Sequence, residues 1–514
     1  MWALVWILIG LGALGVPVLI LTLIVRAGQR GAGGGTAPGA PVRRFFQYWL
    51  MLVALLLAAY GVSGLIRAAA VGSDLLGGRS QVAGPLSAVV VALPLFLVLA
   101  GWTRRRLESD PDERRSIGWL LYITVASVTA LAVTMNSLIG AISNALGDAD
   151  RPAGLWVNGA VWGAIWWAHW VAGRHFIPPD EGRSHRFIGS LLGLWGMLGS
   201  VAGAGVVVAE AAYYELFGSG LITSVATNLR GFVGPFVVST AVWWWYWYQH
   251  TRSERATTGR QAYVLLGGVL VGLLAVLVAV GAILFSILRW FLIDSGDTAL
   301  DNFAPFPAAL VIAAVGWLSW DYHRRVADRT EAGRVGEVRR TYAYLLAGVG
   351  LVAMVVALTF LVAAAIEAMV GGAVLSIFDG SRLALWGLTL GIVGIPLWWR
   401  AWSSVQGRGP AGVDERTLPA RRLYLSASFG VGALFALIAL ITVATRVFED
   451  LFDGGIDGQT IYDARWSLAI VVALGAMAAY HWRVFRSDRE AEPARTGTFE
   501  RLLLIAPGEA AALG

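Results

Sequence analysis

Cysteine is absent from the 514-residue sequence, and all 39 basic residues are arginine, so lysine is absent as well. The absence of cysteine excludes disulfides, thiolate metal sites and cysteine nucleophiles. The absence of lysine excludes a Walker A phosphate loop and Schiff-base catalysis. We interpret the preference for arginine as a compositional bias rather than a functional signal.

Charge is also scarce, because charged residues make up 14% of the chain while 57% are hydrophobic. The mean hydropathy is +0.67, whereas a soluble domain carries about a quarter charged residues. Apolar runs of about 20 residues, the length that crosses the hydrocarbon core as a helix, alternate with short charged loops. The sequence therefore predicts an all-α, polytopic transmembrane protein with about 13 transmembrane helices. The expected spans are 3–25, 45–67, 83–103, 117–141, 154–173, 187–209, 231–249, 262–288, 304–320, 342–366, 383–400, 423–445 and 465–482.

Twelve of these spans fall into six hairpins, and each hairpin begins with basic residues that lead into an apolar helix. These opening segments lie at Arg43-Arg44, Arg114-Arg115, His185-Arg186, Arg260-Gln261, Arg339-Arg340 and Arg421-Arg422. Each hairpin ends in an aromatic and basic closing segment, at 101–104, 166–170, 247–250, 320–324, 398–402 and 480–483. The recurrence predicts six tandem helical-hairpin repeats. Since each repeat holds two helices, successive repeats keep one orientation, unlike the inverted repeats of many transporters.

The predicted domain order begins with an N-terminal transmembrane helix, which has no basic region in front of its long apolar stretch and so does not resemble a signal peptide. A flexible Gly/Pro linker, the six repeats and a disordered cytoplasmic tail follow. The boundaries are 1–26, 27–42, 43–113, 114–184, 185–258, 259–338, 339–420, 421–486 and 487–514.

Arginine distribution predicts the orientation in the cell membrane. The turns within hairpins carry only eight arginines, at Arg67, Arg79, Arg151, Arg230, Arg289, Arg382, Arg446 and Arg465. The remaining arginines lie on the opposite side, and arginine-rich loops are cytoplasmic. We therefore expect the N-terminus and the hairpin turns outside and the C-terminus in the cytoplasm.

The candidate site residues form a recurrent motif where the helices meet the cytoplasmic interface. They are Arg43, Arg44, Arg114, Arg115, Arg339, Arg340, Arg421, Arg422, His169, His250, His323 and His481. The arginines are expected to orient the chain and to bind anionic lipid headgroups, at about 1 kcal/mol each. The histidines and neighbouring aromatic residues are expected to be polar tips in an interfacial belt, and the Asp-Glu pairs of the same loops to be solvated.

No metal, cofactor or catalytic residue is predicted. Two of the six closing segments lack histidine, which a set of haem or metal ligands would not tolerate. The sequence contains no nucleotide-binding loop, no Ser-His-Asp spacing and no ionisable residue near the middle of a span. Glycine pairs at Gly199 and Gly203, Gly268 and Gly272, and Gly387 and Gly391 predict close helix packing instead.

Three functions stay open. The favoured one is a non-catalytic scaffold or assembly subunit of a membrane complex. The alternatives are a channel or carrier for a neutral or lipid-like substrate, and an enzyme or cofactor protein. The expected partners are the lipid bilayer, anionic lipid headgroups at the cytoplasmic face and other membrane proteins, and no nucleic acid is expected.

Residues 421–425, 396–400 and 480–483 carry a resemblance to a known family. They resemble a group of bacterial multi-pass membrane proteins of unknown function, which are built from tandem helical hairpins. The resemblance covers residues 43–486 and is weaker in the first three repeats, where segments such as His185-Arg186-Phe187 depart from the pattern. It implies a membrane location and a repeated fold, and it implies no activity.

Overall fold

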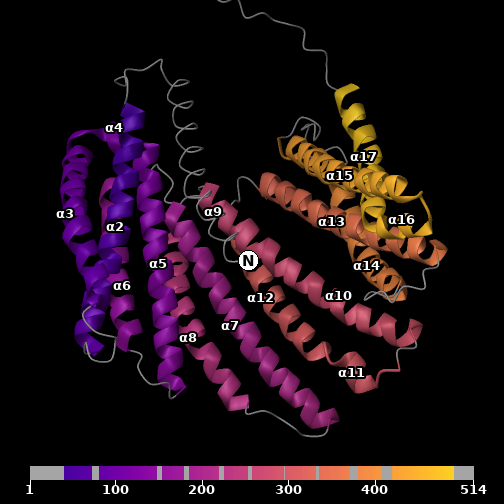
Figure 1. Ribbon diagram of the computed structural model, residues 1–514, viewed down its shortest axis with the longest axis horizontal. Coiled ribbons are helices and arrows are strands. Elements are labelled where there is room, and N and C mark those ends of the chain that lie inside the picture. Colours follow the sequence, from indigo (N-terminus) through magenta and orange to yellow (C-terminus); the bar gives the residue numbers. More distant parts are fainter. Residues whose placement is uncertain are drawn as a thin grey trace, which may run out of the picture. The chain divides into compact units, whose positions relative to one another are not determined.

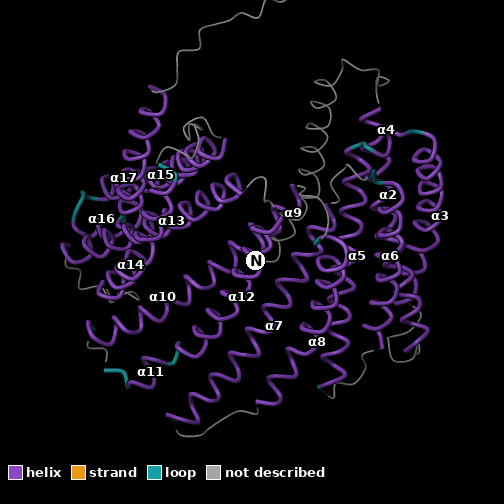
Figure 2. Tube along the Cα trace, turned by 180° about the vertical axis from the view of Figure 1, so that it is seen from behind, coloured by secondary structure: helices purple, strands orange, loops and turns teal. Residues whose placement is uncertain are grey.

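In the computed structural model, the regular secondary structure of the described residues consists of helices alone, with no strand (Figure 2). The structure describes residues 40–71, 80–147, 153–178, 184–218, 225–252, 258–293, 296–330, 335–370, 380–406 and 419–490. The predicted N-terminal helix and most of the linker and the tail lie outside these ranges.

The α-helices are labelled in chain order in Figure 1. The elements of the first three hairpins are α2 (Ala40–Val71), α3 (Ser80–Ser109), α4 (Pro111–Arg114), α5 (Ile117–Leu146), α6 (Ala153–Phe176), α7 (Ser184–Phe217), α8 (Val225–Trp243) and the π-helix η2 (Trp244–Thr251). The fourth hairpin contains α9 (Thr258–Ala262), the π-helix η3 (Tyr263–Leu270), α10 (Val271–Leu292), α11 (Ala299–Phe303) and α12 (Phe306–Thr330). The last two contain α13 (Val335–Val370), α14 (Gly380–Ser404), α15 (Pro419–Asp453), α16 (Gly458–Asp463) and α17 (Arg465–Glu490).

Ten stretches of helix among the described residues are long and apolar enough to cross a membrane. They include all the expected spans from 45 onward except those of α6 and of α8 with η2. Those two helices do form, but they are rich in tryptophan and also carry histidine near their ends. Tryptophan lowers the mean hydropathy of a helix, although it is common where helices meet the membrane interface. The mean hydropathy of these two helices therefore understates how well they suit a membrane.

The described chain divides into two compact units. The first contains Met1–Ala279 and Ala304–Ala332, and the second contains Val280–Phe303 and Gly333–Gly514. In the first unit, neighbouring helices pack in pairs: α2 with α3, α5 with α6, α7 with α8, and η3 with α12. The leading helix of a pair also contacts both helices of the next pair, as α2 does with α5 and α6, and α5 with α7 and α8 (Figure 1).

The second unit shows the same arrangement of neighbours. Helix α13 packs along α14, and α15 packs along α17. Helix α13 also contacts both α15 and α17, which are the helices of the following hairpin.

A capping box forms the start of the short helix α16. The Asp457 side chain accepts from the backbone N–H of Thr460, and the Thr460 hydroxyl lies within reach of the Asp457 N–H.

Backbone contact between helices occurs where the glycine pair at 268 and 272 predicts it. A Cβ added to Gly272 would lie 2.6 Å from the carbonyl oxygen of Gly316, and one added to Gly316 would lie 2.7 Å from that of Gly272. Only glycine allows α10 and α12 to approach this closely.

A Cβ added to Gly387 would likewise lie 2.9 Å from the carbonyl oxygen of Ala357, and one added to Gly203 would clash with the Phe232 ring. Gly199, in contrast, has no atom within 4 Å of the added Cβ, so the pattern identifies a close contact in each pair but not at every glycine.

Candidate functional site

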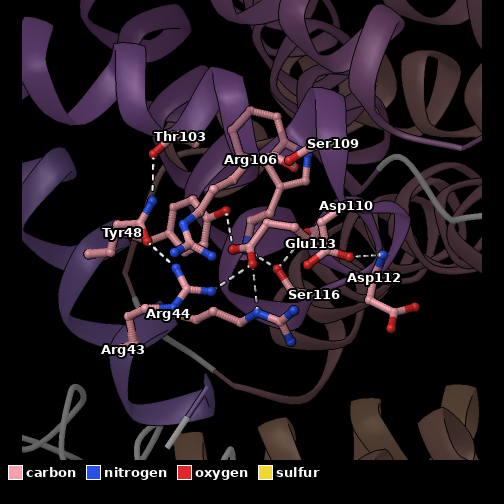
Figure 3. A network of polar contacts seen from close by, with 12 residues as sticks. Arg43, Arg44, Tyr48, Thr103, Arg106, Ser109, Asp110, Asp112, Glu113 and Ser116 are labelled. Carbon is pink, nitrogen blue, oxygen red and sulfur yellow. Dashed lines mark hydrogen bonds and ion pairs between the residues drawn. The ribbon is translucent and has the colours of Figure 1, made fainter. Parts of the chain in front are cut away.

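The opening and closing segments meet at one end of each hairpin, and the first of these meetings is centred on Glu113. Asp110 caps the one-turn helix α4 by accepting from the Asp112 backbone N–H at 2.9 Å, and Pro111 occupies its first position. Ser116 caps the next helix and donates its hydroxyl to the Glu113 carbonyl at 2.7 Å. These caps hold the short helix in an orientation that directs the Glu113 side chain toward α2 (Figure 3).

Three side chains of α2 donate to the Glu113 carboxylate. Arg43 Nη2 and Arg44 Nε reach Oε2 at 2.8 and 3.0 Å, and the Tyr48 hydroxyl reaches Oε1 at 2.8 Å (Figure 3). Glu113 is fully buried, while Arg43 and Arg44 keep 27% and 16% of their side chains exposed. The prediction of solvated loop charge is therefore wrong for Glu113, since a buried carboxylate is stable only when it is paired and hydrogen-bonded.

Two opposing influences set the pKa of Glu113. Burial alone would raise it, but the hydrogen bonds from Arg43, Tyr48 and Arg44 and the charge of Arg44 outweigh burial, so the pKa lies below its ordinary value. The ionised carboxylate is therefore the form that the folded chain stabilises.

This shift predicts a loss of stability in acid. The group has a lower pKa in the folded chain than in the unfolded chain, so its contribution is complete above about pH 4.3, the ordinary value for glutamate, and is lost as pH falls through the folded pKa. Thermal unfolding in detergent, followed by circular dichroism from about pH 8 to about pH 3, measures it. Glu113→Gln is expected to flatten the acid slope, while Glu108→Gln, which removes an exposed pairing with Arg104, is expected to leave it unchanged. Identical acid slopes for the wild type and Glu113→Gln would contradict the assignment.

Three of the four predicted histidines form a buried pair with a tyrosine of the same hairpin. The histidine Nε2 lies 3.0 to 3.3 Å from the tyrosine hydroxyl, and its Nδ1 lies 2.8 or 2.9 Å from the carbonyl four residues earlier. The pairs are Tyr122 with His169, Tyr263 with His323, and Tyr424 with His481. A carbonyl can only accept, so Nδ1 carries the proton and Nε2 accepts from the tyrosine.

The burial of these histidines corrects the picture of headgroup-facing polar tips. His169 is 8% exposed, and His323 and His481 are each 1% exposed. Both ring nitrogens of each are engaged in hydrogen bonds, so the side chains turn inward and join two helices. Within the described ranges, no group of three or more histidine, aspartate or glutamate residues is placed to hold a metal ion.

Two tryptophans of the preceding hairpin extend the tyrosine–histidine pair at two places. Trp243 Nε1 donates to the Tyr263 hydroxyl at 2.8 Å, and Trp398 Nε1 donates to the Tyr424 hydroxyl at 3.3 Å. One helical turn further on, a second tryptophan donates to the tyrosine that directly precedes the histidine. These second bonds run from Trp247 to Tyr322 at 2.9 Å and from Trp402 to Tyr480 at 2.7 Å.

Buried arginines of the opening segments lie over these closing tryptophans. The guanidinium carbon of Arg260 is 5.9 Å from the Trp247 ring centre, and that of Arg421 is 5.3 Å from the Trp402 ring centre. Arg421 also forms a two-pronged ion pair with Asp488, at 2.6 and 3.0 Å. Each of these arginines therefore couples the start of one hairpin to the end of the hairpin before it.

The other predicted residues occupy varied surroundings. Arg114 donates to the backbone carbonyls of Leu107 and Glu108. Arg115 and Arg422 are exposed, Arg340 is half-buried, and the side chain of Arg339 lies outside the described part of the chain. His250 is half-buried and its Nδ1 lies 2.7 Å from the carbonyl of Trp245.

The sequence pattern missed the partners that give these residues their roles. Glu113, Asp488 and the three tyrosines were not predicted to pair with these residues, although Arg260 and Arg421 each precede a tyrosine by three residues. That spacing was the available signal, because residues three apart on a helix share one face. The pairing itself joins residues about 47 to 70 positions apart, which no local pattern shows.

A cavity of about 400 Å³ lies among the first two hairpins. Phe96 and Ala100 of α3, Trp119 and Tyr122 of α5, and Ala168 of α6 line it. Its wall is largely apolar, with the Tyr122–His169 pair among the few polar contributors.

Comparison with known proteins finds one similar family. Residues 44–157 and 340–461 match the family described as domain of unknown function DUF5671, and together these regions make up a little under half of the chain. No curated protein and no solved structure matches the chain. The chain therefore resembles a family without an assigned activity in two separate regions, each of which begins at an arginine of an opening segment, Arg44 or Arg340.

Proposed function

We propose that this chain is a non-catalytic scaffold of the cell membrane, built from six parallel hairpins and one N-terminal helix that together cross the bilayer thirteen times. The arginine distribution supports an outside N-terminus and a cytoplasmic C-terminus. The observation that carries the scaffold role is the linkage between hairpins: buried tryptophan, tyrosine, histidine and arginine side chains bond one hairpin to the next. Among the described residues, each tyrosine of the three tyrosine–histidine pairs donates to its histidine, and two of the three tyrosines also accept from a tryptophan of the preceding hairpin.

The hairpins are proposed to be organised in pairs, as three four-helix modules. The first module contains hairpins one and two, the second contains three and four, and the third contains five and six. The tyrosine–histidine pair occurs in the second hairpin of every module. The two family matches begin where the first and third modules begin. The second and third modules also share a close contact between a glycine and a tryptophan backbone. A Cβ added to Gly193 would lie 2.7 Å from the Cα of Trp243, and one added to Gly350 would lie 2.7 Å from the Cα of Trp398.

Exposed apolar surface at α15 and α3 supports contact with lipids and other membrane proteins. In each of these helices only 11% of the most apolar stretch is buried. Leu434, Phe435 and Ile438 of α15 are each more than half exposed. Such surfaces suit a subunit whose faces are covered by the bilayer and by neighbouring proteins.

Extraction of the chain from its own membranes in polymer-bounded discs tests the scaffold role. Cross-linking before extraction, followed by mass determination of the intact assembly, is expected to give a mass above one copy, with a membrane protein in fixed stoichiometry. Matched extraction of a variant with Leu434→Trp and Ile438→Trp on α15 should reduce that partner. One copy of the chain with lipid alone, in every preparation, would overturn the proposal.

The alternative function is a channel or carrier for a neutral or lipid-like substrate, and the cavity of the first module is the observation that favours it. Purified protein in liposomes should then accelerate flux of a small neutral solute or scrambling of a labelled lipid. Rates equal to those of empty vesicles, for ions, neutral solutes and lipids alike, would remove this alternative.

A further inference from the structure

The cavity of the first module occupies a position that aromatic side chains fill in the third module. Phe96 and Ala100 precede Tyr122 by the same intervals at which Trp398 and Trp402 precede Tyr424, and each set follows a Pro-Leu dipeptide. Ala168 directly precedes His169, as Tyr480 directly precedes His481. The first module therefore has alanine at both positions where the third has the hydrogen-bonded Trp402 and Tyr480.

The filled state of this position is seen twice in the chain. Trp402 is 2% exposed and donates to the Tyr480 hydroxyl at 2.7 Å. Trp247 is completely buried and donates to the Tyr322 hydroxyl at 2.9 Å. Ala100 and Ala168 both line the cavity of the first module, so the space there corresponds to an indole and a phenol ring that the sequence lacks.

Trp119 provides an independent sign that the space takes a ligand. It lines the cavity, is 3% exposed, and has no hydrogen-bond acceptor for its indole N–H. It also stands three residues before Tyr122, the place that Arg260 and Arg421 hold before their tyrosines. Because an unpaired buried donor costs free energy, a ligand oxygen acting as acceptor would stabilise this arrangement.

The rim of the cavity is basic. Arg104 and His175 line it and are exposed. Arg104 has one ion-pair partner, Glu108, in a pair whose side chains are 74% and 49% exposed. Exposed pairs of this kind contribute little, so Arg104 can exchange Glu108 for a phosphate. The three parts of the cavity correspond to the three parts of a phospholipid. The apolar interior suits an acyl chain, the unpaired Trp119 N–H suits an ester carbonyl, and the basic rim suits the phosphate.

We propose that this cavity binds one acyl chain of an anionic glycerophospholipid, with an ester carbonyl of that lipid accepting from Trp119 and its phosphate lying near Arg104. The volume of about 400 Å³ lies within the range of small-molecule sites, about 300 to 1,000 Å³. The bilayer itself supplies this ligand. The site is independent of the scaffold role and holds equally for a carrier.

Photolabelling with a phosphatidylglycerol that carries a diazirine in one acyl chain tests the site on the full chain in detergent. After irradiation and digestion, the label is expected on α3, α5 and α6 at residues that line the cavity, in competition with unlabelled phosphatidylglycerol. Label found only on outward-facing positions such as Val90 or Val98, which are 64% and 70% exposed, would overturn the proposal. This measurement on the wild type does not depend on any variant folding.

The variant Ala100→Trp with Ala168→Tyr rebuilds the aromatic pair of the third module and closes the space. We expect it to lose at least about tenfold in labelling of the cavity residues, equal to about 1.4 kcal/mol of binding free energy. The control variant, Val98→Trp with Trp167→Tyr, introduces the same two aromatic residues at exposed positions of α3 and α6 and should label like the wild type. Equal labelling of both variants would mean that the acyl chain of the lipid lies outside the cavity, and it would overturn the proposal.

A comparison of lipids tests the headgroup. The wild type should prefer the phosphatidylglycerol probe to a phosphatidylcholine probe with the same chains. Arg104→Gln should reduce that preference by about fivefold, the factor that corresponds to about 1 kcal/mol for one arginine near an anionic lipid surface. Equal labelling by both probes in the wild type would overturn the anionic part of the proposal. The flux assay for a carrier is separate, so a negative flux result with positive photolabelling leaves the site standing.

Discussion

Replacing Glu113 with glutamine is expected to lower the free energy of unfolding of the first module by about 3 kcal/mol. Removal of one member of a buried ion pair costs about 3–5 kcal/mol, because the remaining charge stays buried without compensation. The lower end of that range applies here, since Arg43 and Arg44 keep 27% and 16% of their side chains exposed. Thermal or denaturant unfolding in detergent measures the loss.

Two further variants test whether the loss of stability comes from the ion pairs of Glu113 or from the change in side-chain shape. Glu108→Gln on the neighbouring exposed pair should change stability by less than about 0.5 kcal/mol. Combining Glu113→Gln with Arg43→Gln and Arg44→Gln should cost less than Glu113→Gln alone, because no unpaired charge then remains. If the triple variant were less stable than the single one, the pairing would not be the source of the effect.

Replacing Trp402 with alanine is expected to destabilise the third module by about 3 kcal/mol. Loss of a buried Trp or Phe costs about 3–5 kcal/mol in soluble proteins, and part of that cost is transfer to water, which weakens where lipid is the surrounding medium. The substitution removes the hydrogen bond to Tyr480, the stack on Tyr424 with ring centres 5.0 Å apart, and the Arg421 contact.

The neighbouring Trp399 provides a matched control. Its side chain is 67% exposed, and Trp399→Ala should cost less than about 1 kcal/mol, as for other exposed positions. Trp402→Phe keeps a ring in the stack and loses the N–H donor, so it should fall between the two alanine variants. Unfolding in detergent, followed by near-ultraviolet circular dichroism, measures all three, and equal losses for Trp399→Ala and Trp402→Ala would refute this account of the junction.

The sequence was informative about helices because their signal is local. Apolar runs of sufficient length predicted the long helices of the described ranges, and ten stretches among them are long and apolar enough to cross a membrane. Helix α6 and the α8–η2 helix also form where they were predicted, although they are not among those ten. The glycine pair at Gly268 and Gly272 was likewise legible, and Gly272 does bring two backbones together. The site could be predicted only in part. The arginines and histidines were identified as a recurrent motif, but not as parts of a buried network.

The sequence by itself determined that the chain is helical, rich in membrane-spanning segments and free of cysteine and lysine chemistry. These properties depend on residue types and short spacings, which the helix and the bilayer convert directly into structure. Only the tertiary structure decided that Glu113 is a buried ion-pair partner, that His169, His323 and His481 face tyrosines, and that Ala100 and Ala168 border a cavity. Burial and pairing arise between helices far apart along the chain, so the same arginine or histidine letter can denote a lipid-facing charge or a buried link between two hairpins.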